Sequence, residues 1–291
     1  MKEQKYVIKN ISSFELADIF DCGQCFRWNK QQDGSYTGTF KGNVMNVQKK
    51  GDTVTFKGIC NGDIKEIVED YFDLNRNYED IKEKLSKIDE HVKISIEYGQ
   101  GIRILNQDLW EMIISYIISA NNNIPRIKGI IDRVSKNYGK EIVWNGEKYY
   151  TFPTPESLSK ATVEDLRKLG LGFRDKRIYN TTKMILEKQV DLDNIKNMKT
   201  TDEMREELLK LDGVGPKVAD CILLFALKRV DVFPIDVWVR RVMNDLYIHN
   251  ENEEKVSKKE IKKLAEEKFL ELPGLAQQYL FYWKREQSKG A

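Results

Sequence analysis

The stretch LDGVGPKVAD, residues 211–220, places two glycines and a proline directly before Lys217 and then enters an apolar run. The preceding EMREELLKL has the apolar spacing of a helix, and DGVG has the composition of a tight turn. Proline is favoured at the first position of a helix, so PKVADCILLFALK is expected to begin a second helix at Pro216. The sequence therefore predicts a helix-hairpin-helix over residues 204–228.

Two kinds of pattern surround this hairpin. From residue 5 to about residue 58, short strand-like runs such as SYTGTF and TVTFKGI alternate with turn signals, among them Asp33-Gly34. Beyond these, the periodicity is helical to the end of the chain, interrupted only by brief loops. We therefore predict an α+β fold. A twisted antiparallel sheet domain with flanking helices would occupy residues 1–98, and a helical array containing the hairpin would occupy residues 99–291.

Composition restricts the class of protein. The 291 residues are 41% hydrophobic, which is enough for a substantial core, and no apolar run reaches the ~18 to 20 residues of a membrane-spanning helix. The opening MKEQKYVIKN lacks the apolar region of a secretory signal, so we expect the protein to stay inside the cell. The net charge is only +2, so any binding to nucleic acid must depend on a local surface.

The cysteine pattern raises one metal or redox hypothesis. CGQC at residues 22–25 is a C-x-x-C motif, which occurs in redox pairs and as half of a zinc site. The chain has four cysteines and no second C-x-x-C, and neither His91 nor His249 lies near a cysteine in sequence. We therefore interpret the motif as a turn that carries two thiols.

The predicted hairpin suits the DNA backbone. Gly213 and Gly215 would let backbone N–H groups face a phosphate, and the helix N-terminus adds positive potential. A plain interhelical turn is the alternative. Lys217 falls in the first turn of the second helix, where the helix dipole disfavours the ammonium form, and a neutral amine is a nucleophile. Cys221, four residues further on, shares its helix face.

Asp236 is a candidate partner for Lys217. The second helix of about 12 residues spans roughly 18 Å, and RVDVFP (229–234) can cover about 20 Å, so the chain can return. Near the lysine, a carboxylate could stabilise positive charge at a sugar C1′. Asp236 also stands where an N-cap is expected for the helix that follows. Both interpretations stay open.

These residues resemble a known family. LDGVGPKVADCILLFALKRVDVFPIDVWV resembles the helix-hairpin-helix signature of base-excision DNA glycosylases. Nearly the whole chain resembles the 8-oxoguanine DNA glycosylases, through CGQCFRW (22–28), YFDL (71–74), LNQDLWEMIISYIISANNNIPRI (105–127), LRKLGLGFRDKRI (166–178) and LPGLAQQYLF (272–281). The iron–sulfur relatives carry four cysteines near the C-terminus; this chain has none after Cys221, which excludes that branch.

The resemblance implies a bifunctional DNA glycosylase and AP (apurinic/apyrimidinic) lyase that extrudes 8-oxoguanine from duplex DNA. Lys217 matches the nucleophile that attacks C1′ and forms a Schiff base, after which β-elimination cleaves the strand. Asp236 matches the catalytic carboxylate. No cofactor is required, while the backbone carbonyls of Leu209, Leu211 and Val214 match those that hold a structural monovalent or calcium ion.

The resemblance also assigns contacts to the damaged base. Gly23 matches a glycine whose carbonyl accepts a hydrogen bond from N7–H of the lesion, where guanine presents a lone pair instead. Gln277 and Phe281, one helical turn apart, match the residue that reads the Watson–Crick edge and the ring that stacks on the base. Cys221 would close the sandwich. From the residues alone, Gly23 is equally a turn glycine and Phe281 a core aromatic.

Four further residues match contacts on the opposite strand. Asn121, Arg126 and Arg174 match residues that contact the orphaned cytosine, and Phe173 matches an aromatic wedge but lacks its hydroxyl. The chain also differs from many relatives at Trp238, where they carry a histidine near the flipped nucleotide's phosphate.

The expected partner is therefore double-stranded DNA containing 8-oxoguanine. We expect the protein to act as a monomer in the bacterial cytoplasm, with no membrane involved. Two alternatives remain from the sequence: a glycosylase for another damaged purine, and a non-catalytic helix-hairpin-helix DNA-binding protein.

Overall fold

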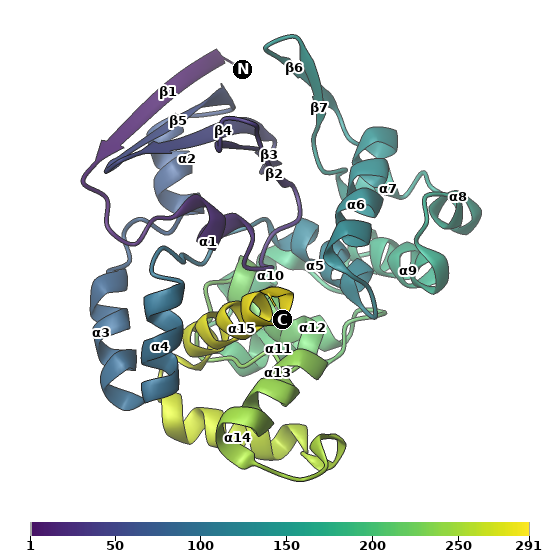
Figure 1. The fold of residues 1–291 in the computed structure, drawn as a ribbon. Coiled ribbons are helices and arrows are strands. Elements are labelled where there is room, and N and C mark those ends of the chain that lie inside the picture. The colour runs from purple at the N-terminus through teal and green to yellow at the C-terminus, as the bar shows by residue number, and fades with distance from the viewer. Residues whose placement is uncertain (1, 291) are drawn as a thin grey trace.

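The computed structural model describes residues 2–290. Its N-terminal part is a five-stranded antiparallel sheet in the order β1-β5-β4-β3-β2 (Figure 1). The strands are β1 Lys2–Lys9, β2 Trp28–Lys30, β3 Tyr36–Phe40, β4 Asn43–Lys50 and β5 Thr53–Cys60. Asp33-Gly34 lies in the predicted turn between β2 and β3, with Gly34 at φ +80°. The predicted antiparallel sheet is confirmed.

Helices make up most of the remaining chain, as predicted. Around the sheet lie α1 Leu16–Phe20 and α2 Ile64–Tyr71; then come α3 Tyr78–Ile88, α4 Glu90–Tyr98, α5 Leu109–Ser119, α6 Ile124–Tyr138, α7 Pro155–Leu158, α8 Val163–Lys168, α9 Asp175–Leu186, α10 Leu192–Asn197, α11 Thr201–Leu209, α12 Pro216–Ala226, α13 Val237–Met243, α14 Lys258–Phe269 and α15 Pro273–Gly290. Residues 109–118 of α5 are all buried, so this helix is central to the array. In Figure 1, α15 runs through the middle of the helical region.

Two main cores hold these parts together. Aromatic residues dominate the core beneath the sheet, where Trp28 stacks on Phe20 with ring centroids 4.3 Å apart. The helical core contains α5 and α12 and also takes in Tyr78 and Leu85 of α3 and Val92 of α4. Both α3 and α4 thus pack with the helical array although they precede residue 98. The division of the chain at residue 98 stays a prediction.

The expectation of helical structure from the sheet to the C-terminus is wrong at one place. Strands β6 Glu141–Trp144 and β7 Glu147–Tyr150 form a second hairpin, joined by Asn145-Gly146 with both residues at positive φ. Asn-Gly between apolar residues is a strong hairpin signal, and IVWNGEKYY carries it. This hairpin packs on the N-terminal sheet, because Trp144 joins Val44 in a small core and donates from Nε1 to Glu3 at 3.0 Å.

No helix within residues 2–290 is long and apolar enough to cross a membrane.

Candidate active site

The predicted helix-hairpin-helix is formed by α11 and α12, with Gly215 at the N-cap and Pro216 at the first position of α12. Gly213 has φ +87°, and a Cβ added there would lie 2.9 Å from Cδ of Arg177. Gly215, in contrast, has no atom within 4 Å of an added Cβ, so its backbone faces open space. A bulky group such as a phosphate can therefore approach the hairpin at Gly215.

Lys217 is half-buried in the first turn of α12. Its Nζ lies 5.3 Å from the centre of the Tyr116 ring, within the range of a cation–π contact. Burial raises the pKa of the Cys221 thiol to about 11, a shift that the Lys217 charge opposes and the Asp236 carboxylate reinforces. Both charged groups act on the same thiol. Asp236 is therefore within electrostatic reach of Cys221 on α12, and its place beside Lys217 stays a prediction.

Asp236 also caps a helix. Its Oδ1 accepts a hydrogen bond from the backbone N–H of Val239 at 2.8 Å, which makes it the N-cap of α13. The cap uses one carboxylate oxygen and fixes the side chain at the start of α13. The capping interpretation is confirmed, and it leaves the second oxygen available for chemistry.

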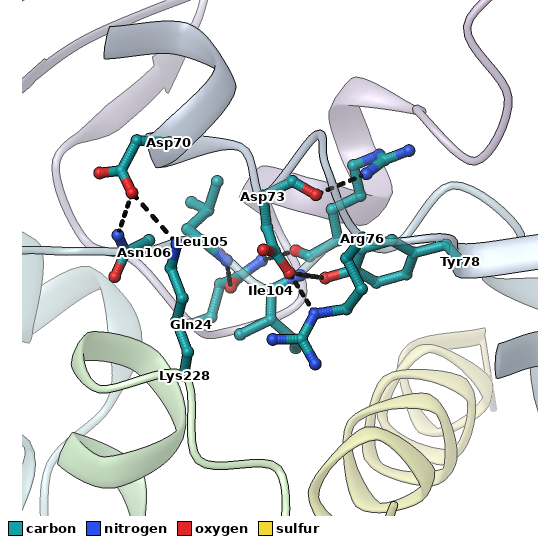
Figure 2. Close-up of polar contacts among 10 residues, drawn as sticks. Gln24, Asp70, Asp73, Arg76, Tyr78, Ile104, Leu105, Asn106 and Lys228 are labelled. Carbon is teal, nitrogen blue, oxygen red and sulfur yellow. Dashed lines mark hydrogen bonds and ion pairs between the residues drawn. The ribbon is translucent and has the colours of Figure 1, made fainter. Parts of the chain in front are cut away.

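Residues 21–25, which we call the lesion-side turn, are held by a buried glutamine that our sequence analysis did not single out. Figure 2 shows Gln24 beside the segment 104–106. Its Nε2 donates to the carbonyl of Arg103 at 2.7 Å, and its Oε1 accepts from the N–H of Leu105 at 2.8 Å. Its own carbonyl accepts from Nε2 of Gln107 at 2.8 Å. Gln24 is fully buried, so these bonds lie away from competing water.

The segment that receives Gln24 is itself fixed at the seam between the two halves of the molecule (Figure 2). The hydroxyl of Tyr78 accepts from the N–H of Ile104 at 2.9 Å. Asp70 accepts from Asn106 at 2.7 Å and from Lys228, just after α12, at 3.1 Å. The seam therefore links the support of the lesion-side turn to the end of the helix that carries Lys217.

The C-terminal helix α15 completes this side of the site. Gln278 donates from Nε2 to the carbonyl of Cys22 at 2.8 Å. Gly23 has φ +91°, and a Cβ added there would lie 3.3 Å from Phe281, so the turn and this ring are in contact. Gln277 is 5% exposed, and its Oε1 finds no hydrogen-bond donor within residues 2–290. A buried acceptor without a partner is costly and indicates that a donor from outside the chain is expected there.

The two thiols of the lesion-side turn are buried and hydrogen-bonded. Cys22 donates to the carbonyl of Ile19 at 3.3 Å, and burial raises its pKa to about 11. Burial also raises the pKa of Cys25. Thiols with raised pKa values are poor nucleophiles, because the reactive form is the thiolate. Their environment agrees with our interpretation of the motif as a turn.

The residues predicted for the opposite strand lie on another surface. Asn121 adopts left-handed backbone, with φ +50°, and is exposed, as is Arg126 in the first turn of α6. Phe173 is 55% exposed, which is unusual for so large an apolar side chain. The guanidinium groups of Arg174 and Arg177 lie 4.2 and 5.5 Å from its ring centre. An exposed aromatic flanked by cations is suited to insertion into DNA.

Arg174 differs from its neighbours because it is 2% exposed. Its guanidinium donates to the carbonyls of Ala120 at 2.9 Å, Asn121 at 2.8 Å and Leu171 at 3.2 Å. Burial lowers its pKa, and the nearby charge of Arg126 adds to that effect. In this state Arg174 braces the loop at residues 120–126, which we call the opposite-strand loop.

The structure also places residues that sequence reasoning missed. Tyr116 of α5 lies between Lys217 and the lesion-side turn, and its hydroxyl donates to the carbonyl of Gln24 at 3.5 Å. It is 3% exposed and looks like any core aromatic in sequence.

Beside Asp236, Val237 and Trp238 are 53% and 38% exposed. A cavity of about 840 Å³ between the β6–β7 hairpin, α5 and α10 includes none of the predicted site residues.

Comparison with known protein families identifies the class. A model of the HhH-GPD superfamily of base excision DNA repair proteins matches residues 114–268, more than half of the chain. The chain therefore belongs to this superfamily. A model of the N-terminal domain of 8-oxoguanine DNA glycosylases matches residues 6–113, so the family within it is that of the 8-oxoguanine DNA glycosylases.

Individual relatives agree with this assignment. The 8-oxoguanine glycosylase/lyase of Clostridium acetobutylicum, solved with double-stranded DNA containing cytosine opposite 8-oxoguanine, is 43% identical with a TM-score of 0.93, over 99% of this chain and 98% of that one. An N-glycosylase/DNA lyase of Saccharomyces cerevisiae is 33% identical over 80% of this chain and 68% of that protein. A probable N-glycosylase/DNA lyase of Methanothermobacter thermautotrophicus is 35% identical, and the match spans 63% of this chain and 64% of that protein.

Proposed function

We propose that the protein is a bifunctional DNA glycosylase and AP lyase that excises 8-oxoguanine from duplex DNA, with Lys217 as the nucleophile. One observation carries this proposal. The carbonyls on either side of Gly23 are held by side chains of the protein, at Cys22 by Gln278 and at Gln24 by Gln107. No hydrogen bond within residues 2–290 reaches the carbonyl of Gly23 itself. A free acceptor on a fixed turn can discriminate for a lesion that has gained an N7–H.

The chemistry starts at Lys217. Its neutral amine attacks C1′ of the flipped nucleotide; the Nζ–C1′ bond forms, the bond from C1′ to the base breaks, and the base leaves with a proton. The C1′–O4′ bond of the sugar ring then breaks as the nitrogen lone pair forms the C1′=Nζ double bond, and O4′ takes up a proton, which gives the protonated Schiff base. Removal of a proton from C2′ then expels the 3′ phosphate and cleaves the strand. Asp236, beside α12, stabilises the positive charge that develops at C1′.

The damaged base enters between Phe281 and Cys221. The ring is half-buried and the thiol is buried. Gln277 then supplies its unpartnered Oε1 to the N–H donors of the Watson–Crick edge. These contacts require a base outside the stack, because C1′ of a stacked nucleotide is out of reach.

The opposite strand is contacted by the second surface. Phe173 enters the duplex, and Asn121 and Arg126 contact the orphaned cytosine. Arg174 reaches that base only when the opposite-strand loop rearranges, because its present hydrogen bonds point inward. Gly213 and Gly215 bring the hairpin backbone to a phosphate of the lesion strand.

A structural cation at the hairpin fits the residues present. The carbonyl of Leu211 accepts one hydrogen bond, from the N–H of Val214 at 3.1 Å, and keeps one lone pair. Within residues 2–290, no backbone N–H outside the helices donates to the carbonyls of Leu209 or Val214. Three such oxygens suit a hard cation, monovalent or calcium, while the chemistry at Lys217 needs no cofactor. Thermal unfolding in potassium, calcium and tetramethylammonium chlorides at equal ionic strength tests this, since only a bound cation raises the midpoint selectively.

A protein that repairs DNA must be located where the DNA of its cell is. We propose that it works as a monomer in the bacterial cytoplasm, supported by the 43% identity to a clostridial enzyme. Size-exclusion chromatography with light scattering tests the monomer.

Borohydride trapping tests the function as a whole. A duplex with one 8-oxoguanine opposite cytosine should give a covalent protein–DNA adduct, because reduction fixes the Schiff base. A second duplex, with an alkylated purine at the same position, is the comparison substrate. An adduct with that lesion but not with 8-oxoguanine would indicate a different glycosylase, and no adduct with either would indicate a binding protein.

A further inference from the structure

Arg285, on α15 one turn beyond Phe281, is a buried charge that the proposed chemistry does not use. It is 9% exposed. Its Nη2 donates to the carbonyl of Asp21 and, at 2.9 Å, to the carboxylate of Glu286. Arginine seldom leaves water to this extent without a structural or functional reason.

The guanidinium lies against both parts of the lesion pocket. Its Cζ is 5.3 Å from the centre of the Phe281 ring, in cation–π range. Its Nη1 would lie 3.0 Å from a Cβ added at Gly23, the same position that meets the Phe281 ring at 3.3 Å. Arg285, Gly23 and Phe281 therefore touch one another at a single point, and α15 sets their spacing.

One polar atom of Arg285 has no partner. Its Nη1 is buried and finds no acceptor within residues 2–290. A surface arginine would turn this group toward water, because an unsatisfied buried donor is unfavourable. Here the other nitrogens are fixed by Asp21 and Glu286, so Nη1 stays against the turn. The guanidinium thus acts as a rigid spacer between the turn and the ring.

We propose that Arg285 is a positioning residue for base recognition: it fixes the lesion-side turn against Phe281 and so sets the place of the Gly23 carbonyl relative to the stacked lesion. This rests on the proposed function, since it concerns the same pocket. With Gln278 and Gln107, Arg285 completes a set of three side chains that hold the carbonyls of residues 21, 22 and 24. Among the carbonyls of residues 21–24, that of Gly23 accepts no hydrogen bond within residues 2–290 and is left for the lesion.

The two activities of the protein separate this role from a merely structural one. Strand cleavage at a preformed AP site has no base to recognise, so it needs Lys217 but not the lesion pocket. Arg285→Met keeps an unbranched apolar stem and removes the guanidinium with its charge and donors. We expect it to slow 8-oxoguanine excision by about 10- to 100-fold, the range for a small misplacement at a reacting centre, and to change AP-site cleavage less than about 2-fold. Arg285→Lys, which keeps the charge but not the planar fork, should fall between.

Lys284→Met is the matched control. It removes one positive charge from the neighbouring position of α15, where Lys284 pairs with Asp245 at 2.6 Å and does not touch the turn. Both rates should stay near those of the unmodified protein. All rates are measured in single turnover at one salt concentration, below the unfolding midpoint of each variant.

Three results would overturn the proposal. Equal slowing of both reactions in Arg285→Met would mean that the residue only stabilises the fold. Normal excision by Arg285→Met would mean that the turn does not depend on it. Failure of the unmodified protein to release 8-oxoguanine, while it still cleaves AP sites, would refute the proposed function and this role together, and it is recognised without any variant.

Discussion

The lesion-side turn and the opposite-strand loop both carry predicted DNA contacts, yet one lies in the interior and the other on the surface. Around Gly23, buried Gln24 and Gln278 hold the backbone, and they are 0% and 2% exposed. Around Asn121, the loop side chains are exposed or half-exposed, and Arg174 braces the loop from within. The Gly23 carbonyl would distinguish 8-oxoguanine from guanine by one hydrogen atom, the proton on N7. Such a contact needs fixed geometry, because an acceptor that can adjust would also accept the wrong base.

The opposite-strand loop can tolerate adjustment because its task is different. A flexible arginine can donate to acceptors in more than one position. An aromatic wedge fills the gap that a flipped base leaves in the duplex, whichever base has left. The comparison suggests that discrimination for the lesion is stricter than discrimination for the base opposite. The following predictions test this contrast, beginning with the largest expected effect.

Lys217→Gln should abolish both excision and borohydride trapping, because the amide cannot form the Schiff base. Binding to lesion-containing duplex should persist, since neither the lesion-side turn nor the opposite-strand loop is altered. Gel-based excision and fluorescence anisotropy measure the two quantities. Lys210→Gln, an exposed lysine of the same hairpin that pairs with Glu207, is the control and should leave both unchanged. Excision by Lys217→Gln at the rate of the unmodified protein would show that the amine is not the nucleophile.

Asp236→Asn should separate catalysis from capping. Asparagine caps helices about as well as aspartate, so the unfolding midpoint should be nearly unchanged. Loss of the negative charge should slow excision by about 10²- to 10³-fold, the range found when one electrostatic contact to a transition state is removed. Thermal unfolding and single-turnover excision are compared on the same sample. A fall in stability with a normal excision rate would mean that Asp236 serves α13 alone.

Arg126→Ala should flatten the preference for the opposite base. We expect the unmodified protein to prefer cytosine opposite the lesion. This preference should be less strict than in relatives whose aromatic wedge carries a hydroxyl, because Phe173 lacks one. Loss of one arginine contact is worth about 1 to 3 kcal/mol, or roughly 5- to 150-fold in relative rate. The rates of excision opposite C, A, G and T, all taken at one salt concentration, measure this preference. Lys136→Ala, further along α6 and paired with Asp132, is the charge-matched control. A uniform fall across all four bases would mean that Arg126 contacts only the backbone.

Gly215→Ala should have the smallest effect, a few-fold loss of DNA affinity that is equal for damaged and undamaged duplex. The added methyl enters open space and so spares the fold, but it stands where a phosphate would approach. Gly213→Ala provides the contrast, because at φ +87° it should destabilise the protein by about 1 to 3 kcal/mol. Unchanged affinity in Gly215→Ala would mean that the hairpin is only an interhelical turn.

Much of the fold and of the site could be predicted from local patterns. The α+β order, the five-stranded sheet and the hairpin of α11 and α12 each leave a signal within a few residues, through alternation, turn glycines and Pro216. Lys217 and Cys221 share a face because helix geometry places i and i+4 together. The β6–β7 hairpin was equally readable from Asn145-Gly146, and the prediction missed it.

Only the tertiary structure decided how the pocket is held. Gln278 and Arg285 contact the lesion-side turn across 256 and 264 residues of sequence, and the bonds of Gln24 to Arg103 and Leu105 span about 80. Such contacts carry no periodicity, so buried Gln24 looks like any polar turn residue and Tyr116 like any core aromatic. For the same reason the sequence carried no sign that Arg174 donates to three carbonyls of its own chain, while its contact with the opposite base stays a prediction. The sequence by itself determined which elements form and which groups can react. Long-range packing and the satisfaction of buried polar groups determined which carbonyl was left free, because both depend on residues that meet only after folding.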